Sequence, residues 1–380
     1  MKVLISSLGA RGDVQPVLAL AMALKALGHT ARLCVAPTFK SWVESYGVEC
    51  VPLGPDLKQM TALGPKGAAK KMVPQSVREQ FQVLGEAAKG CDAVVSATLQ
   101  AAARSIAEVR KLPYVSVTFA PITVPSPDHP PPFIRPQTLP RLVNRVLWRF
   151  TERSWSRTFR PFVNEERAKL GLAPVENMMR HVATDEPWVA ADPVLAPGGT
   201  GAWFLPDPTP LPDALEQFLN EGDAPIYFGF GSRSAGQETG PLFLEAARAL
   251  DRRAIILGGG ANLTVASPGK DCVVVGDVNH EQLLPRAAAI VHHGGAGTTH
   301  AAARAGRPQV VVPSHFDQHY FAHRVRALGI GTSCSLEGLT ASLRQSLRTE
   351  KAAAAQSVAV RMPLDGARRA AERLVQLVSS

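Results

Sequence analysis

The chain has 380 residues, 46% hydrophobic and 19% charged, a composition typical of a globular protein large enough for two domains. Its net charge of +9 is spread along the sequence, without the dense basic blocks and interleaved aromatic residues that indicate nucleic-acid binding. No apolar run approaches the roughly 20 residues needed to cross a bilayer, and the N-terminus lacks the long apolar core of a secretory signal.

The first half alternates short apolar runs with helical patterns. Strands are predicted at residues 3–8, 32–36, 93–97 and 114–119. A helix is expected from about Pro16 to Gly28, because proline suits a first helical turn and glycine commonly ends a helix. This alternation predicts a doubly wound parallel sheet.

A proline-rich segment at 121–140 interrupts this pattern, with eight prolines in twenty residues. A long irregular segment over a rigid sheet is expected at the rim of a binding cleft. The following stretch, 141–167, predicts a helix on which arginines recur every fourth residue. Its apolar neighbours Leu142, Val146 and Phe150 are expected to face apolar surroundings. A solvated face is favoured for the arginines over contact with anionic lipid.

After a second passage rich in proline and glycine, at 193–212, the alternation restarts. Strands are predicted at residues 225–230, 254–257, 272–275, 287–291 and, as the last, 309–312. Two doubly wound halves of this kind face each other across a cleft. Ligands in such sheets bind beyond the carboxyl ends of the strands.

The most informative stretch is VHHGGAGTTH at 291–300, which joins a predicted strand to an alanine-rich helix expected from near Thr298. A glycine-rich turn of this kind presents backbone N–H groups and the positive end of a helix at one point, which is a phosphate-binding arrangement. The two histidines and two threonines add donors. The alternative is a tight turn with core histidines.

Three further features lie at predicted strand ends. Asp13, in GARGD at 9–13, is either a carboxylate at the mouth of the sheet or the N-cap of the next helix; the glycines do not match a dinucleotide fingerprint. The second feature is the glycine turn before Ser232. The third is Asp317 with Gln318, which suit sugar hydroxyls or, alternatively, a helix start.

Several classes of site are not indicated by the sequence. It contains no DxD pair and no HExxH, so no metal site is expected, and no GxSxG, so a serine hydrolase is not expected. The five scattered cysteines, odd in number and without metal-ligand spacing, indicate a reducing, cytoplasmic location.

Six ordered motifs together resemble family 1 glycosyltransferases, in particular the bacterial enzymes for glycopeptide antibiotics of the vancomycin and teicoplanin type. They are RGDVQP (11–16), TDEPWVAADPVLAP (184–197), TGAWFLPD (200–207), YFGFGS (227–232), HHGGAGTT (292–299) and DQ (317–318). Sterol glucosyltransferases share the first and fifth. The resemblance implies a GT-B fold of two Rossmann-like domains and a metal-independent transfer that inverts the anomeric carbon.

The resemblance also implies domain limits and site roles. We expect an acceptor-binding domain at 1–200, a linker at 201–220, a nucleotide-sugar-binding domain at 221–355, and a C-terminal helix at 356–380 that returns to the first domain. Asp13 would be the general base. The residues expected to hold the nucleotide-sugar are Arg11, Ser232, Val278, His293, Gly295, Ala296, Gly297, Thr298, Asp317 and Gln318.

Two positions depart from the family pattern. Ala10 replaces a more frequent serine, and Ala301 stands where plant relatives carry a ribose-binding glutamate. The sequence therefore leaves the donor open between a UDP-sugar, such as UDP-glucose, and a dTDP-sugar. No cofactor, nucleic acid or membrane partner is expected, and the protein is expected to be a monomer. The alternatives are a sterol or lipid glycosyltransferase at a membrane surface, and a non-catalytic nucleotide-sugar-binding or partner-activating protein.

Overall fold

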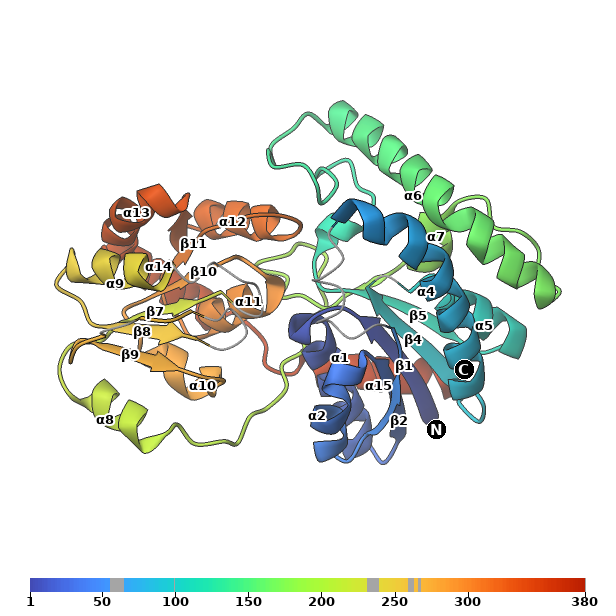
Figure 1. Ribbon diagram of the computed structural model, residues 1–380, viewed down its shortest axis with the longest axis horizontal. Helices are drawn as coiled ribbons and strands as arrows, with labels where there is room; N and C mark the ends of the chain where they lie inside the picture. The colour runs from blue at the N-terminus through green and yellow to red at the C-terminus, as the bar shows by residue number, and fades with distance from the viewer. Residues whose placement is uncertain (55–64, 99, 231–238, 259–262, 266–267, 380) are drawn as a thin grey trace.

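The computed structural model describes residues 1–54, 65–98, 100–230, 239–258, 263–265 and 268–379. Two six-stranded parallel sheets, each flanked by helices, lie side by side (Figure 1). Their strand orders are β3-β2-β1-β4-β5-β6 and β12-β11-β10-β7-β8-β9. The predicted GT-B architecture of two doubly wound domains is therefore confirmed.

The strands are short and apolar, and the central ones are buried on both faces, as parallel strands between helical layers must be. Their bounds are β1 Lys2–Leu8, β2 Thr30–Val35, β3 Glu49–Pro52, β4 Ala93–Thr98, β5 Tyr114–Thr118, β6 Trp188–Val189, β7 Ile226–Gly229, β8 Ala254–Leu257, β9 Cys272–Val275, β10 Ala289–His292, β11 Gln309–Val311 and β12 Gly331–Ser333. Both sheets reverse their strand order at one place, between β1 and β4 and between β7 and β10. Such switch points open a crevice at the carboxyl ends of the strands.

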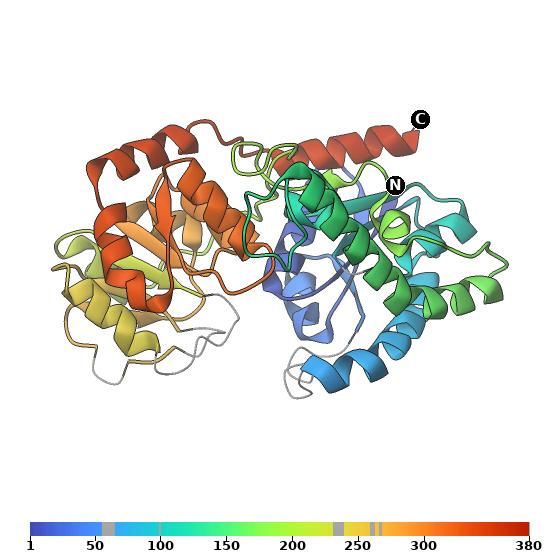
Figure 2. The same cartoon turned by 90° about the horizontal axis from the view of Figure 1, so that it is seen from above.

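The helices cover both faces of each sheet. Their bounds are α1 Arg11–Ala26, α2 Lys40–Ser45, α4 Pro65–Ala87, α5 Ala103–Arg110, α6 Arg141–Lys169, α7 Met178–Ala183, α8 Asp213–Asn220, α9 Thr239–Arg248, α10 His280–Leu283, α11 Ala296–Arg304, α12 Gln318–Ala327, α13 Leu339–Ser346, α14 Thr349–Ala359 and α15 Gly366–Ser379. The last helix, α15, packs against α1 through Ala371 and Leu374, so both chain ends lie at the N-terminal domain (Figure 2).

The bounds of several elements differ from the sequence predictions. Strands β3, β6 and β12 lie on sheet edges and were missed, because their residues, ECVP, WV and GTS, do not form the continuous apolar run that indicates a buried strand. Helix α1 begins at Arg11 rather than near Pro16, which places Asp13 inside its first turn. Residues 213–220 of the expected linker form α8, because Leu215 and Leu219 pack against the second sheet.

The two domains are in direct contact. Ile122 and Leu195, from the first half of the chain, pack with Tyr320 and Phe321 of α12 in one buried cluster. Arg324 in α12 donates from Nε to the Leu195 carbonyl at 2.8 Å. The segment around Leu195 is thus held by the second domain through both apolar and polar contacts.

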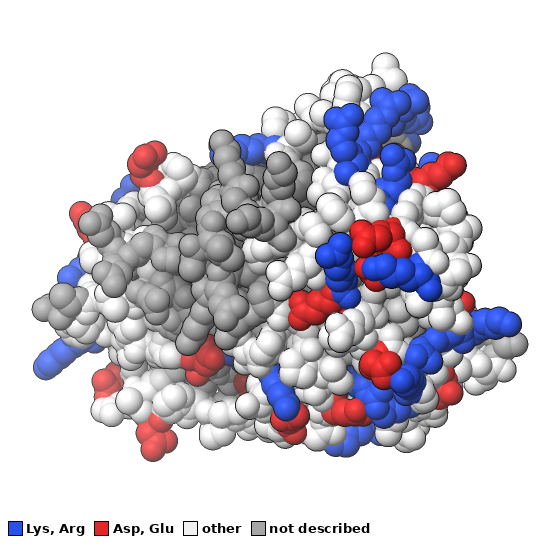
Figure 3. All heavy atoms as spheres, turned by 45° about the vertical axis from the view of Figure 1, so that its right-hand side comes forward, with Lys and Arg blue, Asp and Glu red and all other residues white. Residues whose placement is uncertain are grey.

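Helix α6 projects from the N-terminal domain, where basic side chains gather (Figures 1 and 3). The expectation that Leu142 and Phe150 face apolar surroundings is wrong: they are 70% and 64% exposed. The helix packs instead through Trp148, whose Nε1 donates to the His129 carbonyl at 2.9 Å. Among the described residues, none of the helices combines the length and apolar content needed to span a bilayer.

Candidate active site

The loop that follows β1 reaches the second domain, where it contacts the loop between β9 and α10. Arg11, the first residue of α1, forms an ion pair with Asp277 of the second domain. The Arg11 guanidinium also lies 4.9 Å from the centroid of the Trp42 ring, which orients it. This contact brings the N-terminal motif that contains Asp13 to the C-terminal domain.

Asp13 is held at the N-terminus of α1. One of its carboxylate oxygens, Oδ2, accepts a hydrogen bond from the Ala10 amide at 2.8 Å. A Cβ on Gly9 would lie 2.1 Å from the same oxygen, so only glycine allows this approach, and its φ of +151° also favours glycine. Asp13 therefore does cap the helix, although as its third residue and not as the N-cap, which is Ala10. A carboxylate at this helix end is also stabilised by the helix dipole.

The turn between β10 and α11 requires its two glycines. Gly294 has φ +91°, and a Cβ there would lie 2.6 Å from Val311. A Cβ on Gly295 would lie 2.5 Å from Nε2 of His293, so the imidazole sits directly over this glycine. Gly295 is the N-cap residue, and α11 begins at Ala296, two residues earlier than the sequence predicted.

Part of this turn is left able to bind an anion. The Ala296 amide donates to Oδ2 of Asp317 at 3.3 Å, and the Gly294 amide donates to Nδ1 of His292 at 3.0 Å. In the described part of the chain, the amides of Gly297 and Thr298 donate to no protein acceptor, because the first helical turn offers no carbonyl four residues earlier. Gly297 is exposed. These two amides and the positive end of α11 form a cradle for a phosphate group.

His292 is a core residue and not a donor to a ligand, contrary to the interpretation of both histidines as phosphate donors. Its Nδ1 accepts from the Gly294 amide at 3.0 Å, and its Nε2 donates to Gln309 Oε1 at 2.8 Å. Burial lowers the pKa of His292 to about 3, so the ring is neutral. Thr299 is likewise buried, with Oγ1 bonded to the Gly295 carbonyl at 2.8 Å. His293 and Thr298 are half-buried.

Asp317 and Gln318 lie beside this turn at the start of α12, where Asp317 is the N-cap residue but makes no capping hydrogen bond with its side chain. Buried Gln318 uses Oε1 to accept from the Ser314 amide at 2.8 Å and the Ser314 hydroxyl at 3.0 Å. The bond from Ala296 to Asp317 joins this loop to the phosphate cradle.

Two other residues predicted to hold the nucleotide-sugar are Val278 and Ser232. Val278 is half-buried and packs with the apolar cluster beneath α10. Its neighbour Asn279 fixes this loop by donating to the carbonyls of Asp207 and Thr209 at 2.7 and 2.8 Å. Ser232 lies outside the described residues.

Sequence reasoning missed His300, which gives no signal beyond its place in the alanine-rich helix. Its Nε2 accepts from the Asp192 amide at 3.0 Å, across the domain boundary, and its Nδ1 donates to the Ala296 carbonyl at 2.7 Å. His300 thus links the interdomain segment to the first residue of α11. Burial lowers the pKa of His300 to about 4, so the ring is neutral at pH 7.

This histidine makes stability depend on pH. In the unfolded chain its pKa returns to about 6.5, so acidification protonates the unfolded state first and favours it. We expect the free energy of unfolding, measured in urea, to fall as pH drops from 6.5 toward 4. H300Q keeps an acceptor for the Asp192 amide but does not titrate, and its pH dependence should be shallower. An equally steep dependence in H300Q would show that other groups cause the loss.

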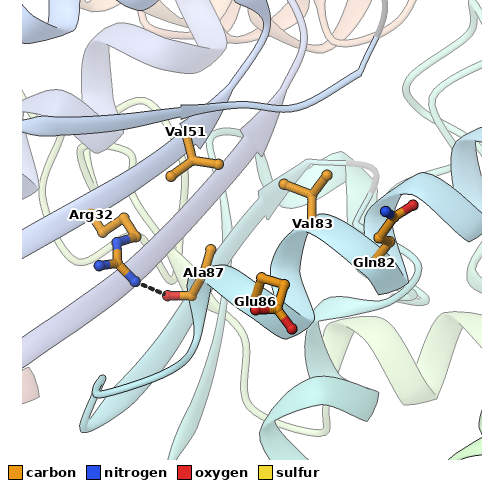
Figure 4. Close-up of a pocket in the computed structure, with 6 residues that line it drawn as sticks. All are labelled: Arg32, Val51, Gln82, Val83, Glu86 and Ala87. Carbon is orange, nitrogen blue, oxygen red and sulfur yellow. Dashed lines mark hydrogen bonds between the residues drawn. The ribbon is translucent and has the colours of Figure 1, made fainter.

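Two observations limit where the chemistry takes place. The described residues contain no cluster of three or more histidine, cysteine or acidic side chains arranged for a metal ion. A pocket lies between β2, β3 and α4, and none of its lining residues belongs to the predicted site (Figure 4). It is lined by Arg32, Val51, Gln82, Val83, Glu86 and Ala87.

Two facing Rossmann-like domains form the GT-B architecture, and the anion-binding turn of the second domain lies at the carboxyl end of β10, where such folds bind ligands. Residues 3–126 match the glycosyltransferase family 28 N-terminal domain. Residues 242–372 match the C-terminal domain of erythromycin biosynthesis protein CIII-like proteins. The chain is 40% identical to the vancomycin aglycone glucosyltransferase of Amycolatopsis orientalis, over 100% of this chain and 98% of that protein.

The dTDP-epi-vancosaminyltransferase of the same organism is 39% identical, over 94% of this chain and 93% of its own length. Among solved structures, spinosyn forosaminyltransferase SpnP has a TM-score of 0.76 at 20% identity, with full coverage of both chains. Glycosyltransferase VinC in complex with dTDP has a TM-score of 0.71 at 21% identity, again with full coverage of both. The chain belongs to the glycosyltransferase family and is a hexosyltransferase.

Proposed function

We propose that this enzyme transfers a sugar from UDP-glucose or a close relative to a hydroxyl of a bulky, partly apolar natural-product aglycone, such as a glycopeptide. The observation that carries the proposal is the Arg11–Asp277 contact, which brings the Asp13 end of α1 to the domain that contains the phosphate cradle. The acceptor class is supported by the vancomycin-type relatives. A dTDP-sugar is the alternative donor, supported by the neighbour solved with dTDP.

In this proposal Asp13 takes the proton of the acceptor hydroxyl. The hydroxyl oxygen attacks the anomeric carbon from the face opposite the leaving group. The bond from the anomeric carbon to the diphosphate oxygen breaks, which inverts the configuration. The charge that develops on the diphosphate is stabilised by the amides of Gly297 and Thr298, by His293 and by the dipole of α11. No metal ion is required, because preorganised donors supply this stabilisation.

The remaining predicted residues would position the donor. Arg11 would exchange its exposed partner Asp277 for the diphosphate, since a surface ion pair contributes at most about 1 kcal/mol. Asp317 and the amide nitrogen of Gln318 would hold sugar hydroxyls. Val278 would lie near the base. Ser232, Gly295 and Ala296 would complete the diphosphate site.

A second candidate is transfer to a sterol or another lipid at a membrane surface. It is favoured by the exposed Leu142 and Phe150 among the arginines of α6, because apolar and basic side chains on one helix face suit an anionic bilayer. For the first candidate we propose a cytoplasmic monomer that binds no nucleic acid. The five free cysteines agree with a reducing compartment.

The experiment that tests the proposal is mass spectrometry of reactions that combine several UDP- and dTDP-sugars with a glycopeptide aglycone, or with a sterol in anionic vesicles. A glycopeptide aglycone whose mass has increased by one sugar supports the first candidate. A glycosylated sterol supports the second. If the protein binds nucleotide-sugar but forms no glycoside with any acceptor, it is a non-catalytic member of the fold.

A further inference from the structure

Two exposed aromatic rings meet at the gap between the domains. Phe133 comes from the proline-rich segment of the first domain, and Phe316 from the loop between β11 and α12 of the second. Their ring centroids are 5.3 Å apart at an interplanar angle of 58°. The two residues are 66% and 45% exposed, respectively, so the pair leaves a large apolar surface in contact with water. Such surface commonly marks a binding site.

Phe316 is held in a backbone conformation that a bulky residue rarely adopts. Its φ is +51°, in the left-handed region that glycine and asparagine favour. The loop that carries Phe316 is held by Gln318, whose Oε1 accepts from the amides of Ser314 and His315 at 2.8 and 3.3 Å. The His315 ring also packs edge-on against Phe316 at 5.3 Å. Strained residues fixed in this way cluster at ligand sites.

The segment that carries Phe133 is fixed on the other side of the gap. The His129 carbonyl accepts from Trp148 of α6, and the His129 ring lies 6.3 Å from the ring of Tyr320 in α12. Asn144 donates to the Pro127 carbonyl at 2.9 Å. The proline-rich segment is therefore anchored to both domains, and it presents Phe133 in a defined place.

The ring pair also lies next to the proposed donor site. Phe316 directly precedes Asp317, and Asp317 accepts from the first amide of α11 in the phosphate cradle. A group that packs on these rings is thus held next to Asp317, which is proposed to bind sugar hydroxyls. Aromatic rings pack well in offset or edge-to-face arrangements whose ring centroids are about 4.5–7 Å apart.

We propose that Phe133 and Phe316 form an aromatic platform that binds an aromatic ring of the acceptor and so determines acceptor specificity. This inference rests on the proposed transfer to a natural-product aglycone and names aromatic aglycones as its preferred class. It also assigns a role to the strain at Phe316, because the left-handed backbone aims the ring across the gap toward the facing domain.

The test uses F133A and F316G, because glycine retains the left-handed backbone without strain while it removes the ring. F150A is the matched control, since Phe150 is 64% exposed, close to the 66% of Phe133, but lies on α6 and not in the ring pair. We measure the KM of an aromatic aglycone, the rate of donor hydrolysis, UDP affinity by calorimetry, and the melting temperature.

Each platform variant should raise the acceptor KM about 3- to 10-fold, the loss expected for one aromatic contact, while donor hydrolysis and UDP affinity stay unchanged. The melting temperature of F316G should be no lower than that of the wild type. F316Y, which keeps an aromatic ring, should have the acceptor KM of the wild type. An unchanged acceptor KM, or a parallel loss of UDP affinity that identifies the rings as a domain latch, would overturn the inference. A wild-type protein that glycosylates no aglycone would instead refute the proposed function.

Discussion

Replacing Asp13 with asparagine is expected to lower kcat/KM for sugar transfer about 10²- to 10⁴-fold, the usual contribution of a general base. Asparagine keeps an oxygen that accepts from the Ala10 amide, so the cap of α1 survives. UDP affinity should therefore stay nearly unchanged. Steady-state kinetics and calorimetry with UDP measure the two quantities separately.

Asp213→Asn is the matched control, because Asp213 is an exposed carboxylate in the first turn of another helix, α8. It should transfer sugar at the wild-type rate. If D13N retains full turnover, Asp13 is only a capping residue. If D13N unfolds or loses UDP binding, the carboxylate is needed for structure and not for proton transfer.

The second large effect is expected for Gly295→Ala. The added Cβ would lie 2.5 Å from Nε2 of His293, so the imidazole must move away from the phosphate cradle. A displacement of about 1 Å in a positioned group can lower the rate about 10²-fold. We therefore expect both weaker UDP binding and a loss in kcat of this order.

A double-mutant cycle identifies the cause. In an H293A background the clash is gone, so Gly295→Ala should change UDP affinity and kcat little further. Gly85→Ala is a neutral control, since its Cβ would make only an ordinary contact at 3.8 Å with Ile106. Additive losses from H293A and G295A would contradict displacement of the imidazole as the reason.

Much of this fold follows from local pattern. Alternating apolar runs and helical stretches predicted the two doubly wound sheets, because buried parallel strands need continuous apolar residues. The edge strands β3, β6 and β12 could not be predicted, since ECVP, WV and GTS lack the apolar run that made equally short strands such as β8 and β9 recognisable. The start of α1 was also misplaced: with Asp13 capping the first turn, the helix begins at Arg11, and Pro16 is its sixth residue.

The site was predicted less completely than the fold. The glycine turn at 294–298 follows from residue type, because glycines and a following helix specify a phosphate cradle. Residue type does not predict that His292 is a core residue while His293 can face a ligand, because burial and the hydrogen bond to Gln309 decide the role of His292. The same holds for His300 and for Gln318, whose partners are distant residues or loop amides that a linear pattern cannot place.

The central claim is that a nucleotide diphosphate binds the start of α11 opposite Asp13, and a crystal structure with bound UDP tests it most directly. The account predicts diphosphate oxygens within hydrogen-bond distance of the Gly297 and Thr298 amides and of His293, with Asp13 facing the same space. A diphosphate bound elsewhere, with these amides left to solvent, would contradict it.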